Sequence, residues 1–315
     1  MLARAVRNGV VETVYDGGVV ATRSDGSVIA TWGTIEPMFY WRSAIKLIQA
    51  TVSQEAGADL APEQLAVACS SHSGWPTHLA TIRKMLHDVG LSEADLRCPP
   101  DWPLGPAARD LVVAAGHRNP RPLFHNCSGK HAAWLRACTA QGWPLGSYLS
   151  PDHPLQQRVV ALTRDVSGVD PMPTGVDGCG APVLRTTLTG AARTFAILSS
   201  DQRFLESATA SHRYAALSSG SERPDAKVGA WWDGPLKVGA AGLIAAGRNG
   251  IGIAAKSWSG DKDIAVVLLI EGARRLGLLS AAALTALADV ARPATLGGGT
   301  PQGAYEPTFD GANHG

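Results

Sequence analysis

The feature that most limits the fold of this chain is the order of its strand-like and helix-like segments. The strand-like segments lie near the two ends. Gly18 to Gly33 is typical of a hairpin, and Leu236 to Trp258 of two strands that turn at Arg248-Asn249-Gly250. Helix-like segments fill the middle. We therefore predict an α/β (α+β) fold, in which a mixed sheet made from both termini has a helical layer inserted between its halves.

Helices are predicted where apolar residues recur at helical spacing or where a proline stands at a helix start. They cover a segment from Ser43, then Pro76 to Val89, Pro106 to Gly116, Gly129 to Gln141, Pro154 to Val166, Thr186 to Tyr214 with a break near Ser199-Ser200-Asp201, Asp263 to Leu276 and Ser280 to Val290. Leu65 to Ser70 fits a short buried strand or a helix end. Gly297-Gly298-Gly299 predicts an irregular tail.

We expect a single catalytic domain over residues 1–315. Its sheet would come from about residues 1–60 and 230–315, and its helical insert from about residues 76–220.

Charge and composition exclude several classes of protein. The formal net charge is +1 with no long run of one sign, which argues against a nucleic-acid binder. No apolar stretch is long enough for a membrane span, and residues 1–8 lack the apolar core of a secretory signal. Five widely spaced cysteines without a CxxC motif argue for a reducing compartment. We expect a cytoplasmic protein that does not bind membranes.

Two glycine-containing segments predict a small-molecule site. They are Asn126-Cys127-Ser128-Gly129-Lys130-His131 and Asp177-Gly178-Cys179-Gly180. Glycine lets the backbone approach a ligand closely, while the neighbouring polar side chains converge on it. The first segment begins a predicted helix, so its N–H groups could hold an anion or an oxyanion. The simpler alternative is a helix cap made by Ser128.

A serine and a lysine at helical spacing indicate nucleophilic chemistry. Ser43 and Lys46 lie three residues apart, so the amine can reach the hydroxyl, and a desolvated lysine can remove its proton. Alone, the pair also fits an exposed helix start. The hydroxyl-rich turn 70–74 and Lys237, inside an apolar strand-like stretch, strengthen the interpretation. Their alternatives are a helix cap by Ser73 and a lysine that reaches solvent from a strand edge.

Together these residues resemble the L-asparaginase II family, the rhizobial type also called class 3. The matching stretches are RSAIK (42–46), SSHSG (70–74), NCSGKHAA (126–133), SPDHPLQQ (150–157) and DGCGAP (177–182), with a looser match at LKVGAAG (236–242). They occur in consistent order and spacing from about Phe39 to the end of the chain.

The resemblance implies a fold similar to serine β-lactamases and glutaminases, with a sheet and a helical subdomain, in a homodimer. It also implies two serine–lysine pairs, Ser43 with Lys46 and Ser71 with Lys237. The implied activity is hydrolysis of the side-chain amide of L-asparagine to L-aspartate and ammonia through an acyl-enzyme. In this scheme Ser43 is deprotonated by Lys46 and attacks, and the second pair relays protons, although the two pairs could exchange roles.

The same resemblance implies a metal site, usually zinc, made by Cys127, Lys130 and Cys179. Zinc there would be structural or modulatory, because a lysine ligand must be neutral and the site lies beside the pocket. The alternative is a pair of buried reduced cysteines with no metal. No organic cofactor is expected.

Five further side chains are candidates to bind or orient the substrate. Arg42 and Asp177 could hold its α-carboxylate and α-amino group through charge-assisted hydrogen bonds. The others are His72, Asn126 and His131.

Two departures from the family pattern bear on the substrate. Trp75 replaces the glutamate that usually follows SHSG, and Gly239-Ala240-Ala241-Gly242 lacks a usual acidic residue. Fewer carboxylates would weaken recognition of an ammonium group, so another small amide stays open as the substrate. A β-lactamase-like or penicillin-binding-like acyl serine enzyme also stays open, although its Ser-x-Asn and Lys-Thr-Gly motifs are missing at any credible place. So does a non-catalytic amino-acid or metal sensor with Trp75 filling the pocket.

Overall fold

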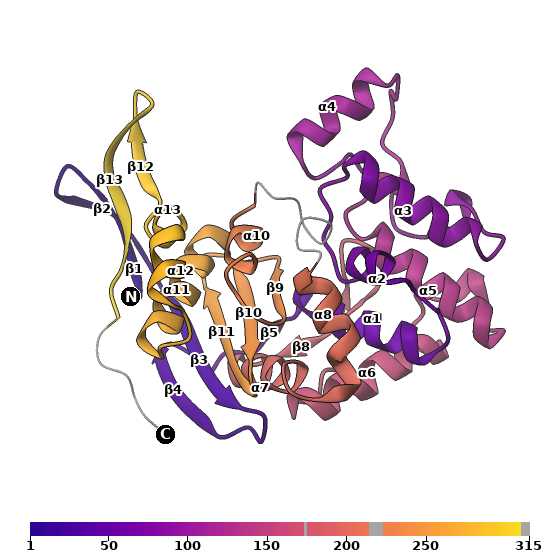
Figure 1. Ribbon diagram of the computed structural model, residues 1–315, viewed down its shortest axis with the longest axis horizontal. Coiled ribbons are helices and arrows are strands. Elements are labelled where there is room, and N and C mark those ends of the chain that lie inside the picture. Colours follow the sequence, from indigo (N-terminus) through magenta and orange to yellow (C-terminus); the bar gives the residue numbers. More distant parts are fainter. Residues whose placement is uncertain (173–174, 214–222, 310–315) are drawn as a thin grey trace.

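The computed structural model describes residues 1–172, 175–213 and 223–309, and is built around an antiparallel sheet (Figure 1). The strand order is β4-β3-β11-β10-β9. The strands are β4 (Val28–Gly33), β3 (Gly17–Arg23), β11 (Ile251–Ser257), β10 (Leu243–Arg248) and β9 (Leu236–Gly239). The sheet mixes strands from the two ends of the chain, and the predicted α/β fold is confirmed.

One helix packs on each face of this central sheet. Helix α7 (Leu188–Leu198) contacts β3, β10 and β11 on one face, and α11 (Lys262–Arg275) contacts the same strands on the other. Side chains alternate between the two faces along each strand, so Ala245 packs in the core on the α7 side and Ile244 in the core on the α11 side. The sheet therefore lies between two separate apolar cores.

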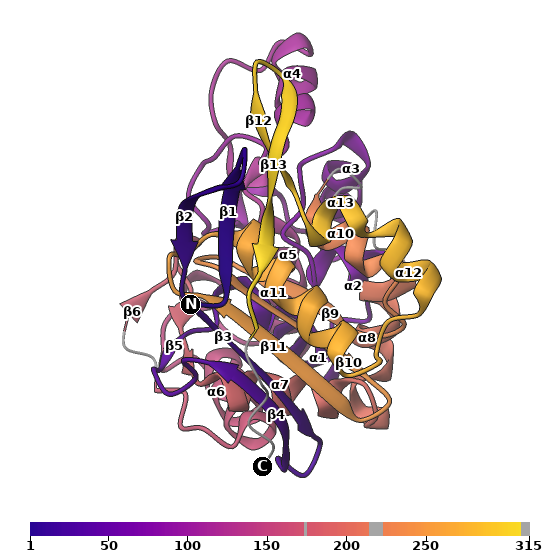
Figure 2. The ribbon, with the colours of Figure 1, turned by 90° about the vertical axis from the view of Figure 1, so that its left-hand side faces the viewer.

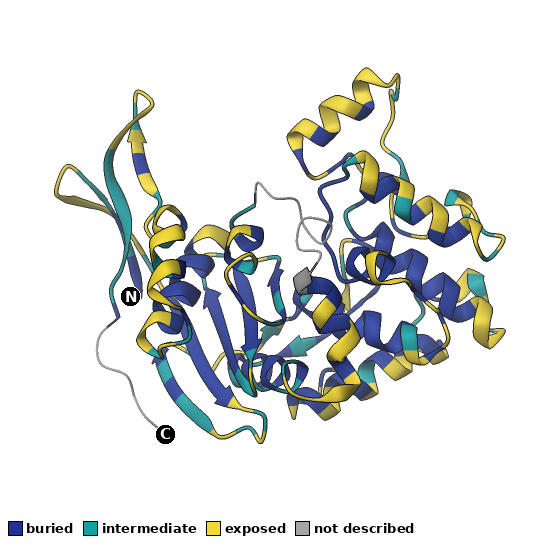
Figure 3. Cartoon of the chain, viewed as in Figure 1, coloured by how far each residue is buried: buried dark blue, intermediate teal, exposed yellow. Residues whose placement is uncertain are grey.

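A helical layer continues the core on the α7 side. Its centre is α5 (Ser128–Gln141), which contacts α1, α2 and α3 and is buried over most of its length (Figure 3). The other helices of the layer are α1 (Lys46–Glu55), α2 (Pro62–Ala68), α3 (Pro76–His87), α4 (Pro106–Ala114), α6 (Pro154–Ser167) and α8 (Leu205–Arg213). Because α5 is buried all round, it fixes the position of its own first residues, which carry a predicted site segment.

A second sheet packs outside α11, with the order β12-β13-β1-β2 (Figure 2). Its strands are β1 (Ala3–Arg7), β2 (Val10–Tyr15), β12 (Ala294–Gly297) and β13 (Thr300–Pro307). Three short helices lie on this side of the molecule: α10 (Pro224–Gly229), α12 (Ala281–Ala286) and α13 (Ala288–Ala291). The remaining strands form two short pairs, β5 (Phe39–Tyr40) with β8 (Arg185–Thr186) and β6 (Gly175–Val176) with β7 (Pro182–Val183).

Most helices begin and end within a few residues of the predicted positions. The ambiguous segment Leu65 to Ser70 is the end of helix α2. The long helical stretch breaks between α7 and α8 as predicted, and Tyr214, its predicted last residue, lies outside the described residues. Within the described part of the chain, no helix is both long and apolar enough to cross a bilayer.

Two predictions about the C-terminal third of the chain are wrong. The stretch from Leu236 holds three strands, because Ala241 and Gly242 take positive φ values of 58° and 75° and make an additional turn. The tail is a hairpin, in which Gly298 and Gly299 take positive φ values between β12 and β13. The N-terminal strands β1 and β2 were not predicted, because β2 is exposed along almost its whole length and lacks the expected alternation.

Candidate active site

The predicted catalytic residues meet between the central sheet and the helical layer. Ser43 lies in the 3₁₀ turn η1 (Arg42–Ile45), which packs against β9, and Lys46 is the first residue of α1. Ser71 lies in the loop between α2 and α3. Lys237 lies on β9, at the edge of the central sheet. Segments separated by up to 194 residues, from Ser43 to Lys237, thus reach one place.

Lys46 is 1% exposed and donates to three oxygen atoms. Its Nζ lies 2.6 Å from the Ser70 carbonyl, 3.1 Å from Ser71 Oγ and 3.3 Å from the Asn126 carbonyl. Burial lowers its pKa, and the nearby Lys130 lowers it further. The side chain therefore ties the start of α1 to both neighbouring loops.

Lys237 approaches the same hydroxyl from the other side. Its Nζ lies 3.4 Å from Ser71 Oγ and 3.0 Å from the Val238 carbonyl, and the side chain is buried. Burial lowers the pKa of Lys237 to about 7, although the Asp225 carboxylate raises it. An amine with that pKa is partly neutral at physiological pH and can accept a proton. Ser71 is thus a hydroxyl held between two buried lysines.

Ser43 has a different environment. It is half-buried, and among the described residues no hydrogen bond joins its hydroxyl to Lys46. The structure therefore brings Lys46 to Ser71 rather than to Ser43. The preceding residue, Arg42, takes a positive φ of 48°, which is unfavourable for a residue with a Cβ. Its Nε lies 2.7 Å from Asp177 Oδ1, so the two predicted substrate-binding charges form an ion pair.

The loops that carry Ser71 and Cys127 are joined to each other. The His72 backbone N–H donates to the Asn126 carbonyl at 3.2 Å. Ser128 Oγ donates to the Leu123 carbonyl, so it accepts from His72 Nε2 at 2.9 Å. His72 is fully buried, and burial lowers its pKa well below the usual value. Of the predicted substrate-binding residues, His72 is thus placed beneath the site rather than at its surface.

The predicted metal ligands also lie together. Lys130 Nζ donates to Cys179 Sγ at 3.1 Å, and Cys127 Sγ donates to Asn126 Oδ1 at 3.2 Å. The adjacent Cys127 thiol lowers the pKa of Cys179, and the Lys130 ammonium acts in the same direction. Burial lowers the pKa of Lys130, but the two sulfurs raise it and the net shift is upward. The cluster therefore favours a Cys179 thiolate beside a Lys130 ammonium.

His131 lies next to this pair and is oriented by a tyrosine. Tyr148 Oη accepts from the Arg97 N–H at 2.9 Å and lies 2.7 Å from His131 Nδ1. The phenol proton is thus available to Nδ1, and the proton of the neutral imidazole stands on Nε2, which is buried and makes no hydrogen bond within the described residues. Burial lowers the pKa of His131 to about 4. His131 therefore does not carry a charge near pH 7.

Cys127, Lys130 and Cys179 carry the types of side chain that can bind a zinc ion. Two thiols and one amine are buried and in contact, and the pKa of Cys179 already favours the thiolate that zinc binds. No group of three or more His, Cys, Asp or Glu side chains suited to a metal occurs in the described ranges. A zinc site here would therefore need Lys130 as its third ligand.

Sequence reasoning missed a pair that contacts the Ser71 loop. Arg223 Nη1 donates to the Ser71 carbonyl at 2.7 Å, and its Nε and Nη2 bind both oxygens of Asp225 at 3.0 Å and 3.2 Å. The contact joins residues 152 positions apart, and Arg223-Pro224-Asp225 matches no motif. The single available signal was the proline at the start of a helix, which predicts the helix and not its partner.

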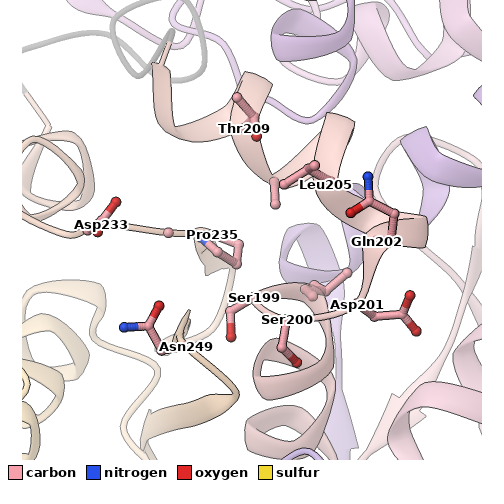
Figure 4. A pocket seen from close by; sticks show the side chains of 12 residues that line it. Ser199, Ser200, Asp201, Gln202, Leu205, Thr209, Asp233, Pro235 and Asn249 are labelled. Atoms are coloured by element: carbon pink, nitrogen blue, oxygen red, sulfur yellow. The ribbon is translucent and has the colours of Figure 1, made fainter.

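A pocket of about 450 Å³ lies where the end of α7 meets the start of α8 (Figure 4). It is lined by the C-terminal end of α7, the start of α8, Asn249 and the segment Asp233-Gly234-Pro235, which leads directly into β9. None of the predicted site residues lines it. Pro235 stands two residues before Lys237, so the pocket wall leads directly into the strand that carries Lys237.

Comparison with solved structures found glutaminases and a β-lactamase. A protein named Mglu, in its native form, is 14% identical with a TM-score of 0.47, over 84% of this chain and 65% of that chain. A Bacillus glutaminase is 12% identical with a TM-score of 0.46, over 84% and 92%. A β-lactamase from Mycobacterium bovis is 14% identical with a TM-score of 0.38, over 84% and 96%. The present chain thus spans about 65% of the length of Mglu.

The fold and the site together define an α/β protein with a buried serine–lysine cluster beside a pair of cysteines. The sequence identifies the family to which this protein belongs. The family model of L-asparaginase II matches residues 3–307, so the chain belongs to the L-asparaginase II family, as predicted. No curated protein matches the sequence. The family membership supports an amidohydrolase.

Proposed function

We propose that this protein hydrolyses the side-chain amide of L-asparagine, or of a closely related small amide, through an acyl-enzyme. The observation that carries the proposal is the convergence of two buried lysines on Ser71 Oγ. One of them, Lys46, follows the half-buried Ser43 by three residues. Burial lowers the pKa of both lysines, so they can move protons.

In the proposed reaction, Ser43 Oγ attacks the amide carbonyl carbon and its proton passes to the lysine cluster. The cluster then returns a proton to the amide nitrogen as the C–N bond breaks and ammonia leaves. Water attacks the resulting ester, which releases the carboxylic acid and restores Ser43. Ser71 joins Lys46 to Lys237 and relays protons between them. Ser71 has the lysine contacts and Ser43 the greater exposure, so the two serines can exchange roles.

The Arg42–Asp177 ion pair supports recognition of a zwitterionic amino acid. Its guanidinium would bind the substrate α-carboxylate and its carboxylate the α-amino group, once the substrate replaces their mutual contact. Ala241 lies in the turn after β9, and its carbonyl accepts from Lys256 Nζ at 2.5 Å. With Ala241 and Trp75 at positions that are acidic in the family pattern, the substrate can differ from free asparagine.

The test is ammonia release from a panel of amides that includes asparagine, glutamine and a β-lactam. We expect asparagine or a near relative to be hydrolysed, and Ser43→Ala to reduce turnover by about 10³-fold or more. Ser71→Ala is measured beside it to assign the nucleophile, and Ser24→Ala, in the β3–β4 turn, serves as the control. Wild-type turnover in Ser43→Ala would exclude Ser43 as the nucleophile, and β-lactam turnover alone would exclude the amidase.

We also propose that Cys127, Lys130 and Cys179 hold zinc, which would fix the two loops and tune the polarity of the pocket. Because the pKa of Lys130 is raised, binding must displace its proton, so zinc affinity should increase with pH. Zinc content by elemental analysis should fall in Cys179→Ser and not in Cys138→Ser, whose buried thiol has a pKa of about 12. Equal zinc content in both variants would contradict the site.

The predicted homodimer and cytoplasmic location are further proposals. Size-exclusion chromatography with light scattering tests the first, and a monomer at micromolar concentration would contradict it.

A further inference from the structure

The pair Arg223–Asp225 lies next to the serine–lysine cluster and was not among the predicted site residues. Arg223 stands just before helix α10, and Asp225 is the second residue of that helix. The two side chains form a two-point ion pair with contacts of 3.0 Å and 3.2 Å. Asp225 is 6% exposed, and Arg223 is also mostly buried. A two-point arginine–carboxylate contact in a buried place has a well-defined geometry.

The guanidinium makes a third contact, which reaches the catalytic loop. Arg223 Nη1 donates to the Ser71 backbone carbonyl at 2.7 Å. Lys46 donates to the carbonyl of the residue before it, Ser70, at 2.6 Å. Two cations thus hold consecutive carbonyls of one loop, and the hydroxyl between the lysines belongs to that loop. Displacing the loop by 1 Å would disturb the 3.1 Å and 3.4 Å contacts of Ser71 Oγ.

The carboxylate has a second effect, which is electrostatic. Helix α10 packs against β9, the strand that carries Lys237. Asp225 is the carboxylate that most raises the pKa of Lys237, whereas Arg223 and Lys46 lower it. The charged or titratable groups that face Lys237 among the described residues are Asp225, Arg223, Lys46, Cys127 and Cys69. Asp225 thus supplies the only carboxylate of this set.

We propose that Arg223 and Asp225 are positioning residues for the serine–lysine cluster: the guanidinium fixes the Ser71 loop, and the carboxylate balances the positive charges around Lys237. The two charges act on Lys237 with opposite sign. Removing the carboxylate leaves the guanidinium unbalanced beside the amine, and removing the guanidinium leaves the carboxylate unbalanced. The importance of this role for catalysis rests on the proposed amide hydrolysis. The electrostatic effect of the two residues on Lys237 is present without any substrate.

The test follows Lys237 directly, by NMR titration of protein carrying ¹³C at the lysine ε carbon. Lys237→Met assigns the resonance. In Asp225→Asn, the titration midpoint of Lys237 should move to lower pH by roughly 0.5–1 unit, and in Arg223→Met it should move to higher pH by a similar amount. The double variant Arg223→Met/Asp225→Asn should return close to the wild-type midpoint. A role limited to packing would give no shift, or shifts of one sign, in both single variants.

A conservative variant separates the loop contact from the charge. Arg223→Lys keeps the charge but loses the guanidinium contacts to Asp225 and to the Ser71 carbonyl. The titration midpoint of Lys237 should therefore stay within about 0.3 pH unit of the wild-type value, while kcat falls by about tenfold or more at unchanged KM. If Arg223→Met does not fold, Asp225→Asn, which keeps the shape of the side chain, still decides the direction of the shift.

The outcomes separate the inference from the proposed function. If the midpoints move in opposite directions but the wild-type protein releases no ammonia from any amide, the positioning pair stands and the amidase proposal fails. If ammonia is released and the midpoints do not move, or move in the same direction, the amidase stands and the positioning pair is overturned.

Discussion

Lys237 shows how burial can prepare a side chain for chemistry. It sits on an edge strand, reaches a serine hydroxyl at 3.4 Å and has a pKa lowered to about 7 by burial. A lysine in water has a pKa near 10.4 and carries its proton throughout the physiological range. The folded chain thus converts an ordinary cation into a group that exchanges protons near neutral pH.

This property predicts the pH dependence of the reaction. The neutral amine is the active base and predominates above about pH 7, so kcat/KM should fall as the pH decreases through about 7. In Lys237→Met, turnover should fall by about 10²-fold or more and the acid limb should disappear. Ammonia release is measured between pH 5 and 9. The exposed Lys262→Met is the control, and an acid limb retained by Lys237→Met would assign that limb to another group.

At this scale the sequence predicted residue types better than contacts. The Ser-x-x-Lys spacing predicted a bond from Lys46 to Ser43, because helical neighbours usually meet. The Lys46 amine instead lies on Ser71, since the chain around Ser43 is a 3₁₀ turn and three oxygen acceptors from distant loops surround the amine. Arg223 could not be predicted, because its partners are set by tertiary packing alone.

Among the secondary-structure elements, α7 and the central sheet make the closest contact. A Cβ added at Gly252 of β11 would stand 1.9 Å from the Ala192 carbonyl and 2.5 Å from the Ala196 nitrogen, both in the α7 backbone. A Cβ added at Gly247 of β10 would stand at the same distance, 1.9 Å, from the Phe195 carbonyl oxygen. Glycine at these positions therefore lets the helix backbone rest directly on the strands.

Gly252→Ala should lower the free energy of unfolding by about 3 kcal/mol, because neither the strand nor the helix backbone can move away without losing its hydrogen bonds. The change is measured by urea unfolding. The matched control is Gly229→Ala in α10, where no atom lies within 4 Å of the new Cβ and alanine is the better helix former. A loss below 1 kcal/mol in Gly252→Ala would show that α7 can shift.

The elements themselves were largely predictable, and the reasons are physical. Pro76, Pro106 and Pro154 each stand at the first position of a helix, where their fixed φ is favourable. The β9–β10 turn was missed because its Ala-Ala-Gly sequence carries no typical turn residue before the glycine, yet Ala241 takes a positive φ. The β12–β13 hairpin was missed because three consecutive glycines usually indicate irregular chain.

For the molecule as a whole, one apolar core joins the sheet to the helical layer. The cluster that contains Trp134 of α5 also contains Val20, Ala245 and Ala254 of the central sheet. Because neither part has a core of its own on this side, they should unfold together. Urea unfolding followed by tryptophan fluorescence and by far-ultraviolet circular dichroism should give one coincident transition. Two separated transitions would show that the helical layer is stable alone.

The pairing of β3 with β11 has a consequence for how the protein is made. Ala254 lies beside Val20 in the finished sheet, but the ribosome adds it more than two hundred residues later. Until then the β3–β4 hairpin has an open edge and the early helices lack part of their apolar contacts. The nascent chain should therefore depend on chaperones until β11 has been made, and Ser71 meets its second lysine only after 166 further residues have been added.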